Sequence, residues 1–290
     1  MDQNTQAVSK VTVPHILERK LRGEKVTCLT AYDYSAARLV DDAGIEMILV
    51  GDSLAQTVLG YDSTVPVTVD EMLHHLRAVR RGVQRALLIA DMPFGSYHVS
   101  DDQALTNAIR FIKEGGAEAV KLEGGASRAA LVKKLVESQI PVMGHIGLTP
   151  QSIHTFGGYR VQGRTLDSAA ELQADAEALE EAGAFAIVLE GIPRELAAII
   201  TRRLRIPTIG IGAGPDCDGQ VLVYHDLLGL TFGQTAKFVR SYANLREVIH
   251  QALTHFRDDV TQGCYPDDSE SYHWTSAMRA QFEKDATRSS

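Results

Sequence analysis

The sequence has few cysteines and few aromatic residues, and it has no long apolar run. Only 6% of its 290 residues are aromatic, and three are cysteine. Cys28, Cys217 and Cys264 form no CxxC pair and are odd in number, which argues against a disulfide framework and against a cysteine zinc site. This cysteine usage favours a reducing compartment, and we expect a cytoplasmic protein.

Neither a membrane span nor a secretion signal is predicted. No stretch approaches about 18 uninterrupted apolar residues, the length that a spanning helix needs. The N-terminal segment MDQNTQAVSKVTVPHILERK lacks the apolar core of a signal peptide.

An excess of positive charge is also missing. The chain has 29 Lys and Arg against 37 Asp and Glu, a net charge of −8 at pH 7. This balance argues against nucleic acid or an anionic membrane as the main partner, although a local basic pocket is compatible with it. With 44% hydrophobic and 23% charged residues, the composition is that of a soluble globular protein.

The sequence does contain a regular alternation of short apolar runs and helical stretches. The runs are rich in Val, Ile, Leu and Ala and are bounded by Gly, Pro or Asp. This pattern predicts parallel strands at residues 26–33, 46–53, 86–93, 118–125, 141–148, 185–191, 208–214 and 220–226. Eight strands of this kind predict an α/β fold, a (β/α)8 TIM barrel.

We predict a single barrel domain over residues 1–262 and a polar C-terminal tail over residues 263–290. One connection leaves an alternative open, because only about five residues separate the last two strand candidates, too few for a standard crossover helix. An open, doubly wound sheet is the alternative fold.

Charged residues interrupt the apolar run EAVKLEGG at residues 118–125. Lys121 and Glu123 are two positions apart, so they lie on the same face of the predicted strand. A buried charge without a partner costs several kcal/mol. The two residues are therefore either a structural ion pair or part of a site.

Acidic residues stand where four of the eight predicted strands end. They are Asp52, Asp91, Glu123 and Glu190; Lys121 lies on the fourth predicted strand and His145 at the end of the fifth. Each has a plain structural alternative, since an aspartate can cap a turn and a histidine can be satisfied in a core. Independent capping would not be expected to place a carboxylate at the end of four of eight strands. The carboxyl ends of the strands are also where the active sites of such barrels lie.

This set of residues suits one kind of chemistry. Carboxylate oxygens favour Mg²⁺, whereas zinc sites usually contain several His or Cys ligands. A metal bound by Asp52, Asp91 and Glu123 can polarise a 2-oxo acid and stabilise its enolate. Glu190 is then the candidate base, and Lys121 the candidate partner of the substrate's negative charge.

Longer motifs resemble one enzyme family. In chain order they are TAYDYSAA, ILVGDSLAQTVLGYDSTVPVTVDEMLHH, IADMPFGSY, AVKLEGG, GHIGLTPQSIHTFGGYRVQGR, VLEGIP and IGIGAGPDCDGQVLVYHDLLGL. Together they resemble the ketopantoate hydroxymethyltransferases of the phosphoenolpyruvate/pyruvate superfamily, from about residue 11 to residue 273. The segment WTSAMRAQFEKDATRSS extends beyond the usual end of that family, and Gly191 stands where other members carry other small residues.

The resemblance implies a reaction and its participants. A one-carbon unit passes from the co-substrate 5,10-methylenetetrahydrofolate to 3-methyl-2-oxobutanoate and gives 2-dehydropantoate, the first step of pantothenate biosynthesis. The resemblance also implies a (β/α)8 barrel that assembles into large rings, typically homodecamers.

The same resemblance assigns roles to individual residues. Asp52 and Asp91 match Mg²⁺ ligands that also contact substrate, and Glu123 matches a third acidic residue that acts directly or through water. Ser53 and Lys121 match substrate-binding positions, Glu190 matches the catalytic base, and His145 matches a polar residue of the substrate pocket.

Two other functions stay open at this point. A class I aldolase would use Lys121 to form a Schiff base with its carbonyl substrate. A metal-binding or regulatory barrel would keep the metal site without catalysing proton exchange.

Overall fold

Eight parallel strands form a closed barrel in the computed structural model, which describes residues 9–288. The strands are β1 (Val26–Thr30), β2 (Met47–Val50), β3 (Leu87–Asp91), β4 (Ala119–Glu123), β5 (Val142–Gly147), β6 (Ala186–Glu190), β7 (Thr208–Ile211) and β8 (Gly219–Leu222). Each strand pairs with the next, and β8 pairs with β1. The predicted (β/α)8 barrel is confirmed, and the open-sheet alternative is wrong.

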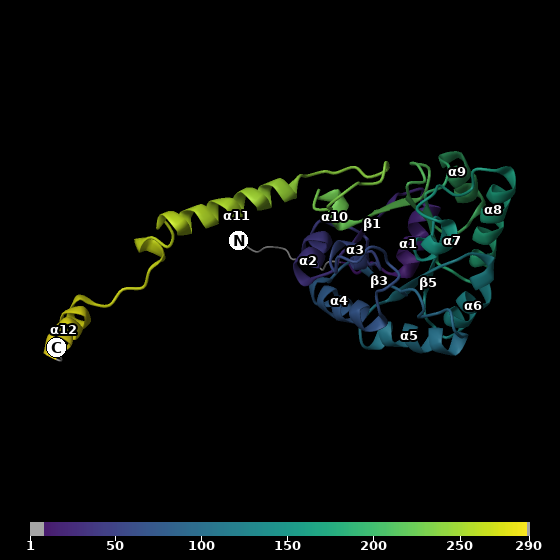
Figure 1. Ribbon diagram of the computed structural model, residues 1–290. Helices are drawn as coiled ribbons and strands as arrows, with labels where there is room; N and C mark the ends of the chain where they lie inside the picture. The colour runs from purple at the N-terminus through teal and green to yellow at the C-terminus, as the bar shows by residue number, and fades with distance from the viewer. Residues whose placement is uncertain (1–8, 289–290) are drawn as a thin grey trace. The chain divides into compact units, whose positions relative to one another are not determined.

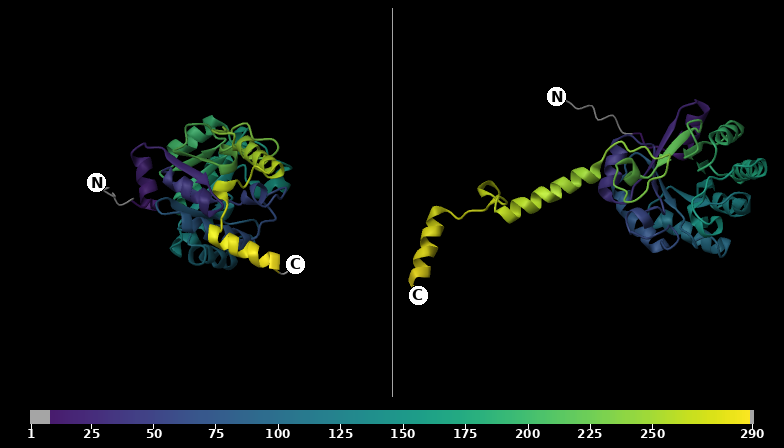
Figure 2. Two further views of the ribbon diagram at one scale, coloured as in Figure 1. Left: turned by 90° about the vertical axis from the view of Figure 1, so that its left-hand side faces the viewer. Right: turned by 45° about the horizontal axis from the view of Figure 1, so that its top comes forward.

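Helices surround the strands (Figures 1 and 2). They are α1 (Val13–Leu21), α2 (Tyr34–Asp42), α3 (Leu54–Thr57), α4 (Val69–Gly82), α5 (Asp101–Lys113), α6 (Ala129–Glu137), α7 (Ile153–Phe156), α8 (Leu166–Glu181), α9 (Arg194–Arg203) and α10 (Tyr224–Leu227). Two short 3₁₀ turns, η1 (Ala126–Arg128) and η2 (Pro150–Ser152), follow β4 and β5.

Local sequence explains where several of these helices begin. The side chain of Asp33 accepts a hydrogen bond from Ala36 N at the start of α2. Thr68 and Glu71 form a reciprocal capping box at the start of α4. These side chains satisfy backbone N–H groups that have no partner within the helix.

The alternation of side chains along each strand creates two apolar layers. In β4, Val120 and Leu122 pack in the layer between the strands and the helices, while Ala119 packs in the core inside the barrel. Lys121 and Glu123 share the inward face with Ala119 because strand side chains alternate with a period of two. The β4 sequence therefore directs both charges to the barrel interior.

The link between β7 and β8 contains no helix and runs through residues 212–218. Asp218 secures the end of this link: its Oδ2 accepts from Thr208 N at 2.8 Å and from Lys20 Nζ at 2.8 Å. Gly219 begins β8, and a Cβ at this position would lie 2.5 Å from the carbonyl oxygen of Val26. A close backbone approach and a partly buried carboxylate thus close the barrel where a crossover helix is absent.

The chain divides into two units. One extends to Leu227 and includes Thr231–Tyr242, and the other comprises Leu228–Leu230 and the residues from Ala243 onward. The second unit contains α11 (Leu245–Gln262), η3 (Asp268–Glu270) and α12 (Ser276–Arg288). The predicted division between residues 1–262 and 263–290 stays a prediction, and residues 1–8 and 289–290 of those ranges lie outside the described residues.

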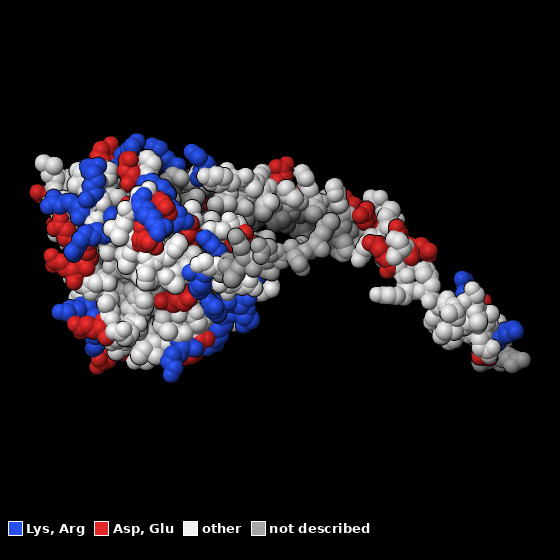
Figure 3. Space-filling model, turned by 180° about the vertical axis from the view of Figure 1, so that it is seen from behind, with Lys and Arg blue, Asp and Glu red and all other residues white. Residues whose placement is uncertain are grey.

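Positive and negative side chains are mixed over the barrel surface seen in Figure 3. Within residues 9–288, no helix is both long enough and apolar enough to span a membrane.

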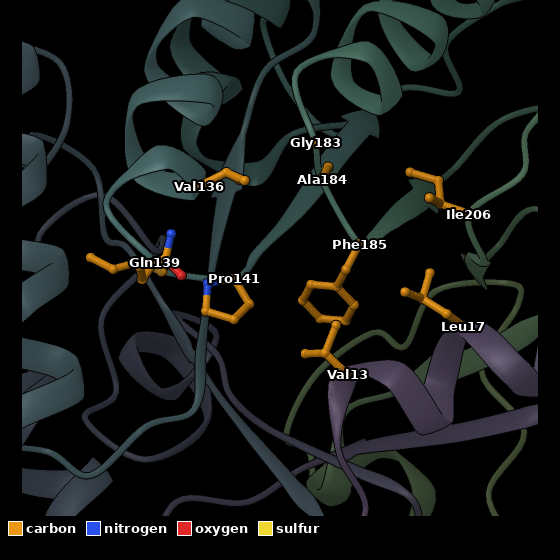
Figure 4. A pocket seen from close by; sticks show the side chains of 10 residues that line it. Val13, Leu17, Val136, Gln139, Pro141, Gly183, Ala184, Phe185 and Ile206 are labelled. Atoms are coloured by element: carbon orange, nitrogen blue, oxygen red, sulfur yellow. The ribbon is translucent and has the colours of Figure 1, made fainter.

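An apolar hollow of about 320 Å³ lies at the amino ends of the strands (Figure 4). Phe185 and Pro141 line it directly before β6 and β5, and Val13 and Leu17 of α1 cover one side. It contains none of the predicted site residues, which lie toward the opposite ends of the strands.

Candidate active site

Six predicted residues, here called the mouth cluster, lie at or near the carboxyl ends of β2 to β6. They are Asp52, Asp91, Lys121, Glu123, His145 and Glu190. Strand register aligns several of them: Asp91 pairs with Lys121, Glu123 pairs with His145, and Glu190 pairs with Gly147. The mouth of the barrel therefore brings together charged groups from positions distant in sequence.

Two positions differ in detail from the sequence prediction. Asp52 does not end a strand, because β2 stops at Val50 and Asp52 lies in the following turn. His145 lies within β5, which continues to Gly147. Both side chains still belong to the mouth cluster, since the strands deliver them to the same end of the barrel.

Lys121 connects the two sides of the cluster. Its Nζ lies 2.8 Å from Asp91 Oδ1 and 3.2 Å from His145 Nδ1. The residue is only 4% exposed, so the ammonium group contacts protein charge instead of bulk water. The sequence left open whether Lys121 belongs to a structural ion pair or to a site. Lys121 does form an ion pair, but its partner Asp91 is itself a predicted site residue.

His145 lies between the two glutamates. Its Nδ1 is 3.5 Å from Glu123 Oε1, and its Nε2 is 3.2 Å from Glu190 Oε2. Glu190 is the more accessible of the two carboxylates, with a side chain 14% exposed against 3% for Glu123. Glu190 is thus a partly accessible carboxylate that lies next to the imidazole of His145.

Three polar residues that the sequence did not single out complete the site. Gln151, in η2, donates its side-chain amide to Asp52 Oδ2 at 2.9 Å and its backbone N–H to Glu123 Oε2 at 3.0 Å. Tyr97 OH donates to Gln151 Oε1 at 2.7 Å. Tyr32 OH lies 2.8 Å from the hydroxyl oxygen of Ser53, which fixes the predicted substrate-binding serine beside Asp52.

Burial and mutual repulsion shape the charges of the two aspartates. Burial raises the pKa of Asp52 well above its ordinary value, and the charges of Asp91 and Glu123 raise it further. Burial also raises the pKa of Asp91, although Lys121 acts in the opposite direction. A cation placed between the two aspartates would therefore stabilise their ionised forms.

Glu123, Lys121 and His145 favour their charged forms. Burial acts to raise the pKa of Glu123, but His145, Lys121 and the Gln151 N–H outweigh it, and the pKa is lowered. Burial acts to lower the pKa of Lys121, but Asp91, Glu123 and Asp52 outweigh it, and the pKa is raised. Burial and Lys121 act against the protonated form of His145, yet Glu123 and Glu190 raise its pKa to about 9.

The donor set fits a hard cation such as Mg²⁺. Glu123 Oε1 is a buried acceptor that lacks a well-oriented hydrogen bond, and Asp91 Oδ1 has Lys121 Nζ at 2.8 Å but no well-oriented hydrogen bond either. Buried acceptors of this kind call for a physical explanation. Among the residues that the structure describes, no three Asp, Glu, His or Cys side chains converge on one point. Mg²⁺ needs only one or two protein carboxylates because it retains several waters.

Comparison with known proteins supports a specific family. A sequence model described as "Ketopantoate hydroxymethyltransferase" matches residues 10–268. The chain is 63% identical over 275 residues to the 3-methyl-2-oxobutanoate hydroxymethyltransferase of Koribacter versatilis. The matched region covers 95% of this chain and 93% of that protein. It is 58% identical over 264 residues to the enzyme of the same name from Moorella thermoacetica. That match covers 91% of this chain and 98% of the relative.

Solved structures share the fold at much lower identity. A 2,3-dimethylmalate lyase of the PEP mutase/isocitrate lyase superfamily superimposes with a TM-score of 0.57 at 18% identity, over 96% of this chain and 99% of that one. Phosphonopyruvate hydrolase in complex with oxalate and Mg²⁺ gives a TM-score of 0.58 at 15% identity, over 95% and 96%. The barrel, the family match and the close relatives together show that the chain belongs to the ketopantoate hydroxymethyltransferase family of enzymes.

Proposed function

We propose that the chain transfers a hydroxymethyl group from 5,10-methylenetetrahydrofolate to 3-methyl-2-oxobutanoate, by way of an enolate, to form 2-dehydropantoate. The observation that supports this most strongly is the placement of a Lys–Asp pair and a separate, more accessible glutamate at one barrel mouth. Proton removal next to a carbonyl needs both a base and positive charge near the developing oxyanion.

The substrate is held at the side of the cluster formed by β2 to β4. Lys121 neutralises the carboxylate or the 2-oxo oxygen of the acid, and the Ser53 hydroxyl, held by Tyr32, donates a hydrogen bond to it. Burial of the cluster excludes water around these contacts and strengthens them. The substrate's C3 then faces the β6 side of the barrel.

Glu190 acts as the base. It takes the C3 proton, and the electron pair of the broken C–H bond moves toward the 2-oxo oxygen to give the enolate. His145 Nε2, 3.2 Å from Glu190 Oε2, orients the carboxylate and balances its charge. The C3 carbon next bonds to the methylene carbon of the folate, and water supplies the hydroxyl oxygen as both bonds from that carbon to the folate nitrogens break. The two nitrogens take one proton from the water and the one that Glu190 removed from C3, and tetrahydrofolate leaves.

Asp52 and Asp91 would hold Mg²⁺, with Glu123 contributing directly or through water. The bound ion would supply a Lewis acid that withdraws electron density from the 2-oxo group. The phosphonopyruvate hydrolase of the same fold, described with oxalate and Mg²⁺, supports this choice, because oxalate resembles the enolate of a 2-oxo acid.

The Schiff-base alternative is disfavoured by the surroundings of Lys121. A Schiff-base lysine must lose its proton to attack a carbonyl, and enzymes lower its pKa for that purpose. The three carboxylates around Lys121 raise its pKa instead. The geometry therefore supports an electrostatic role for Lys121.

Proton exchange without folate tests the proposal. The protein is incubated with 3-methyl-2-oxobutanoate and Mg²⁺ in D₂O, and the C3 proton is followed by ¹H NMR. We expect the signal to disappear with Mg²⁺ and to persist with EDTA. Exchange that continues unchanged in EDTA would contradict the metal role, and no exchange at all would contradict the enolate.

We further propose that the enzyme works in the cytoplasm as a homodecamer. Family membership supports the ring assembly, and α11 exposes apolar side chains such as Leu253 and Phe256, which are suited to subunit contacts. Light scattering coupled to gel filtration measures the assembly directly. A monomeric mass would contradict this part of the proposal.

A further inference from the structure

Gln151 forms hydrogen bonds with four other residues at the barrel mouth, through its side chain and its backbone. It is 4% exposed and lies in η2, the turn that follows β5. Its Nε2 donates to Asp52 Oδ2 at 2.9 Å and to the carbonyl oxygen of Met92 at 3.0 Å. Its Oε1 accepts from Tyr97 OH at 2.7 Å.

These partners determine the orientation of the amide. Asp52 Oδ2 and the Met92 carbonyl can only accept hydrogen bonds, so the NH₂ end must face them. Tyr97 OH donates to the oxygen end and also accepts from Glu123 N at 3.2 Å. A flipped amide would place its oxygen against two acceptors, which makes the observed orientation the only satisfied one.

The same residue also reaches Glu123 through its backbone. Gln151 N donates to Glu123 Oε2 at 3.0 Å, and Glu123 Oε1 is left without a well-oriented hydrogen bond. Asp91 shows the same pattern, because Asp52 N engages its Oδ2 and leaves Oδ1 facing Lys121. In both Glu123 and Asp91, a backbone N–H group thus binds one carboxylate oxygen.

We propose that Gln151 is a positioning residue that determines which oxygens of Asp52 and Glu123 face the substrate and its cation. This inference rests on the proposed function, in which those carboxylates hold Mg²⁺. Gln151 touches neither the reacting carbon nor the base, and it acts through Asp52 by its side chain and through Glu123 by its backbone. It also ties the turn after β5 to the segments that follow β2 and β3.

A Gln151→Met variant tests the side-chain part of this role. Methionine matches glutamine in length and fills the same buried space, but it cannot donate to Asp52. The backbone bond to Glu123 remains. Groups that orient metal ligands typically contribute about 10- to 100-fold to metal affinity, so we expect the dissociation constant for Mn²⁺, used as a spectroscopic substitute for Mg²⁺, to rise by about that factor.

The measurement is a titration of the purified full-length protein with Mn²⁺, in which free Mn²⁺ is read by electron paramagnetic resonance. Gln173→Met is the matched control, because Gln173 is a partly buried glutamine of α8 whose side-chain amide donates to Glu177 Oε1 at 3.1 Å. The control should bind Mn²⁺ as the wild type does. Thermal unfolding of each variant establishes that it is folded.

A second variant covers the case in which methionine prevents folding. Gln151→Asn keeps a polar amide in the site but is one methylene shorter, so it cannot keep the bonds to both Asp52 and Met92. It should also weaken Mn²⁺ binding and lower kcat more than it raises KM for the 2-oxo acid.

Each result has a definite meaning. Wild-type Mn²⁺ affinity in a folded Gln151→Met or Gln151→Asn protein overturns the positioning role while leaving the proposed function intact. An equal loss in Gln173→Met also overturns it. Failure of the wild type itself to bind Mn²⁺ overturns the metal part of the proposed function and this inference together.

Discussion

The Nε2 atom of His145 lies 3.2 Å from Oε2 of Glu190, and this contact joins the neighbouring fifth and sixth strands at the mouth of the barrel. The other side of the same ring faces Glu123 and Lys121. The imidazole therefore separates the residue proposed as the base from the carboxylates proposed to hold the metal. Removal of the base should leave substrate binding largely intact.

Glu190→Gln separates proton abstraction from binding. Glutamine keeps the size of the side chain but removes the basic oxygen, so we expect C3 deuterium exchange to slow by at least about 10²-fold, as is typical when a general base is removed. Binding of Mg²⁺ and 3-methyl-2-oxobutanoate should persist in calorimetry. Exchange at the wild-type rate with intact binding would exclude Glu190 as the base and make His145 the next candidate to test.

Lys121→Arg tests whether the ammonium group neutralises charge. Arginine keeps the positive charge but has a planar, larger head group, and the 2.8 Å contact to Asp91 leaves little space for it. We expect weaker binding of the 2-oxo acid, read as a higher KM, with metal binding reduced but not abolished. Recovery of a borohydride-trapped adduct on Lys121 of the wild type would favour the aldolase mechanism instead.

Asp52→Ala tests the metal assignment. Asp52 is buried in a turn at the barrel mouth, where its charge is repelled by Asp91 and Glu123. Its removal should abolish turnover and weaken Mg²⁺ binding, while far-ultraviolet circular dichroism and the unfolding temperature stay close to those of the wild type. Normal Mg²⁺ binding and turnover in this variant would show that the metal is held elsewhere.

Glu46 predicts a dependence of stability on acid that has no connection with catalysis. Its Oε2 accepts from Thr27 N at 2.9 Å, and Arg19 pairs with its other oxygen. Burial acts to raise its pKa, but the hydrogen bonds from Thr27 and the charge of Arg19 outweigh it and lower the pKa. The ionised form therefore stabilises the folded state above the unfolded-state pKa, and this contribution is lost as the pH falls through the folded-state pKa.

Glu46→Gln should accordingly lower the free energy of unfolding at pH 7 by about 1–3 kcal/mol, the usual value of hydrogen bonds to a charged group. The difference from the wild type should shrink at acid pH. Urea unfolding at several pH values measures it. Glu137→Gln is the control, because Glu137 is 67% exposed and only 3.9 Å from Lys133, and it should show no such difference. A gap that stays constant down to acid pH would show that the charge of Glu46 is not involved.

The sequence predicted most of the mouth cluster because a simple periodicity controls it. Asp91, Glu123 and Glu190 are each the last residue of a strand, and the two-residue period directs Lys121 to the same interior as Glu123. Once eight parallel strands are inferred, the carboxyl ends of those strands must meet. Residues on strands could therefore be located without any tertiary information.

Residues on turns could not be located in the same way. Gln151 follows a proline in a short 3₁₀ turn, and nothing in GLTPQS shows that the chain folds back over β2 to β4. The β7–β8 link was similarly ambiguous, since its stability comes from Asp218 bonding to Thr208 and Lys20, which are distant from one another in sequence. In both cases tertiary contacts determine the structure, and no local pattern predicts them.

The alternation in β4 has a consequence for which changes the gene can tolerate. Val120 and Leu122 face the helices, while Lys121 and Glu123 face the barrel interior. Residues that pack the apolar layer therefore alternate along β4 with residues proposed to act in the site. A conservative exchange at one position disturbs one function only. Deletion of a single codon between Ala119 and Lys121 would shift the phase, turn the two charges toward α5 and α6, and place a leucine among the carboxylates. Substitutions at Val120 and Leu122 that keep their apolar volume should therefore be tolerated better than an insertion or deletion in this strand.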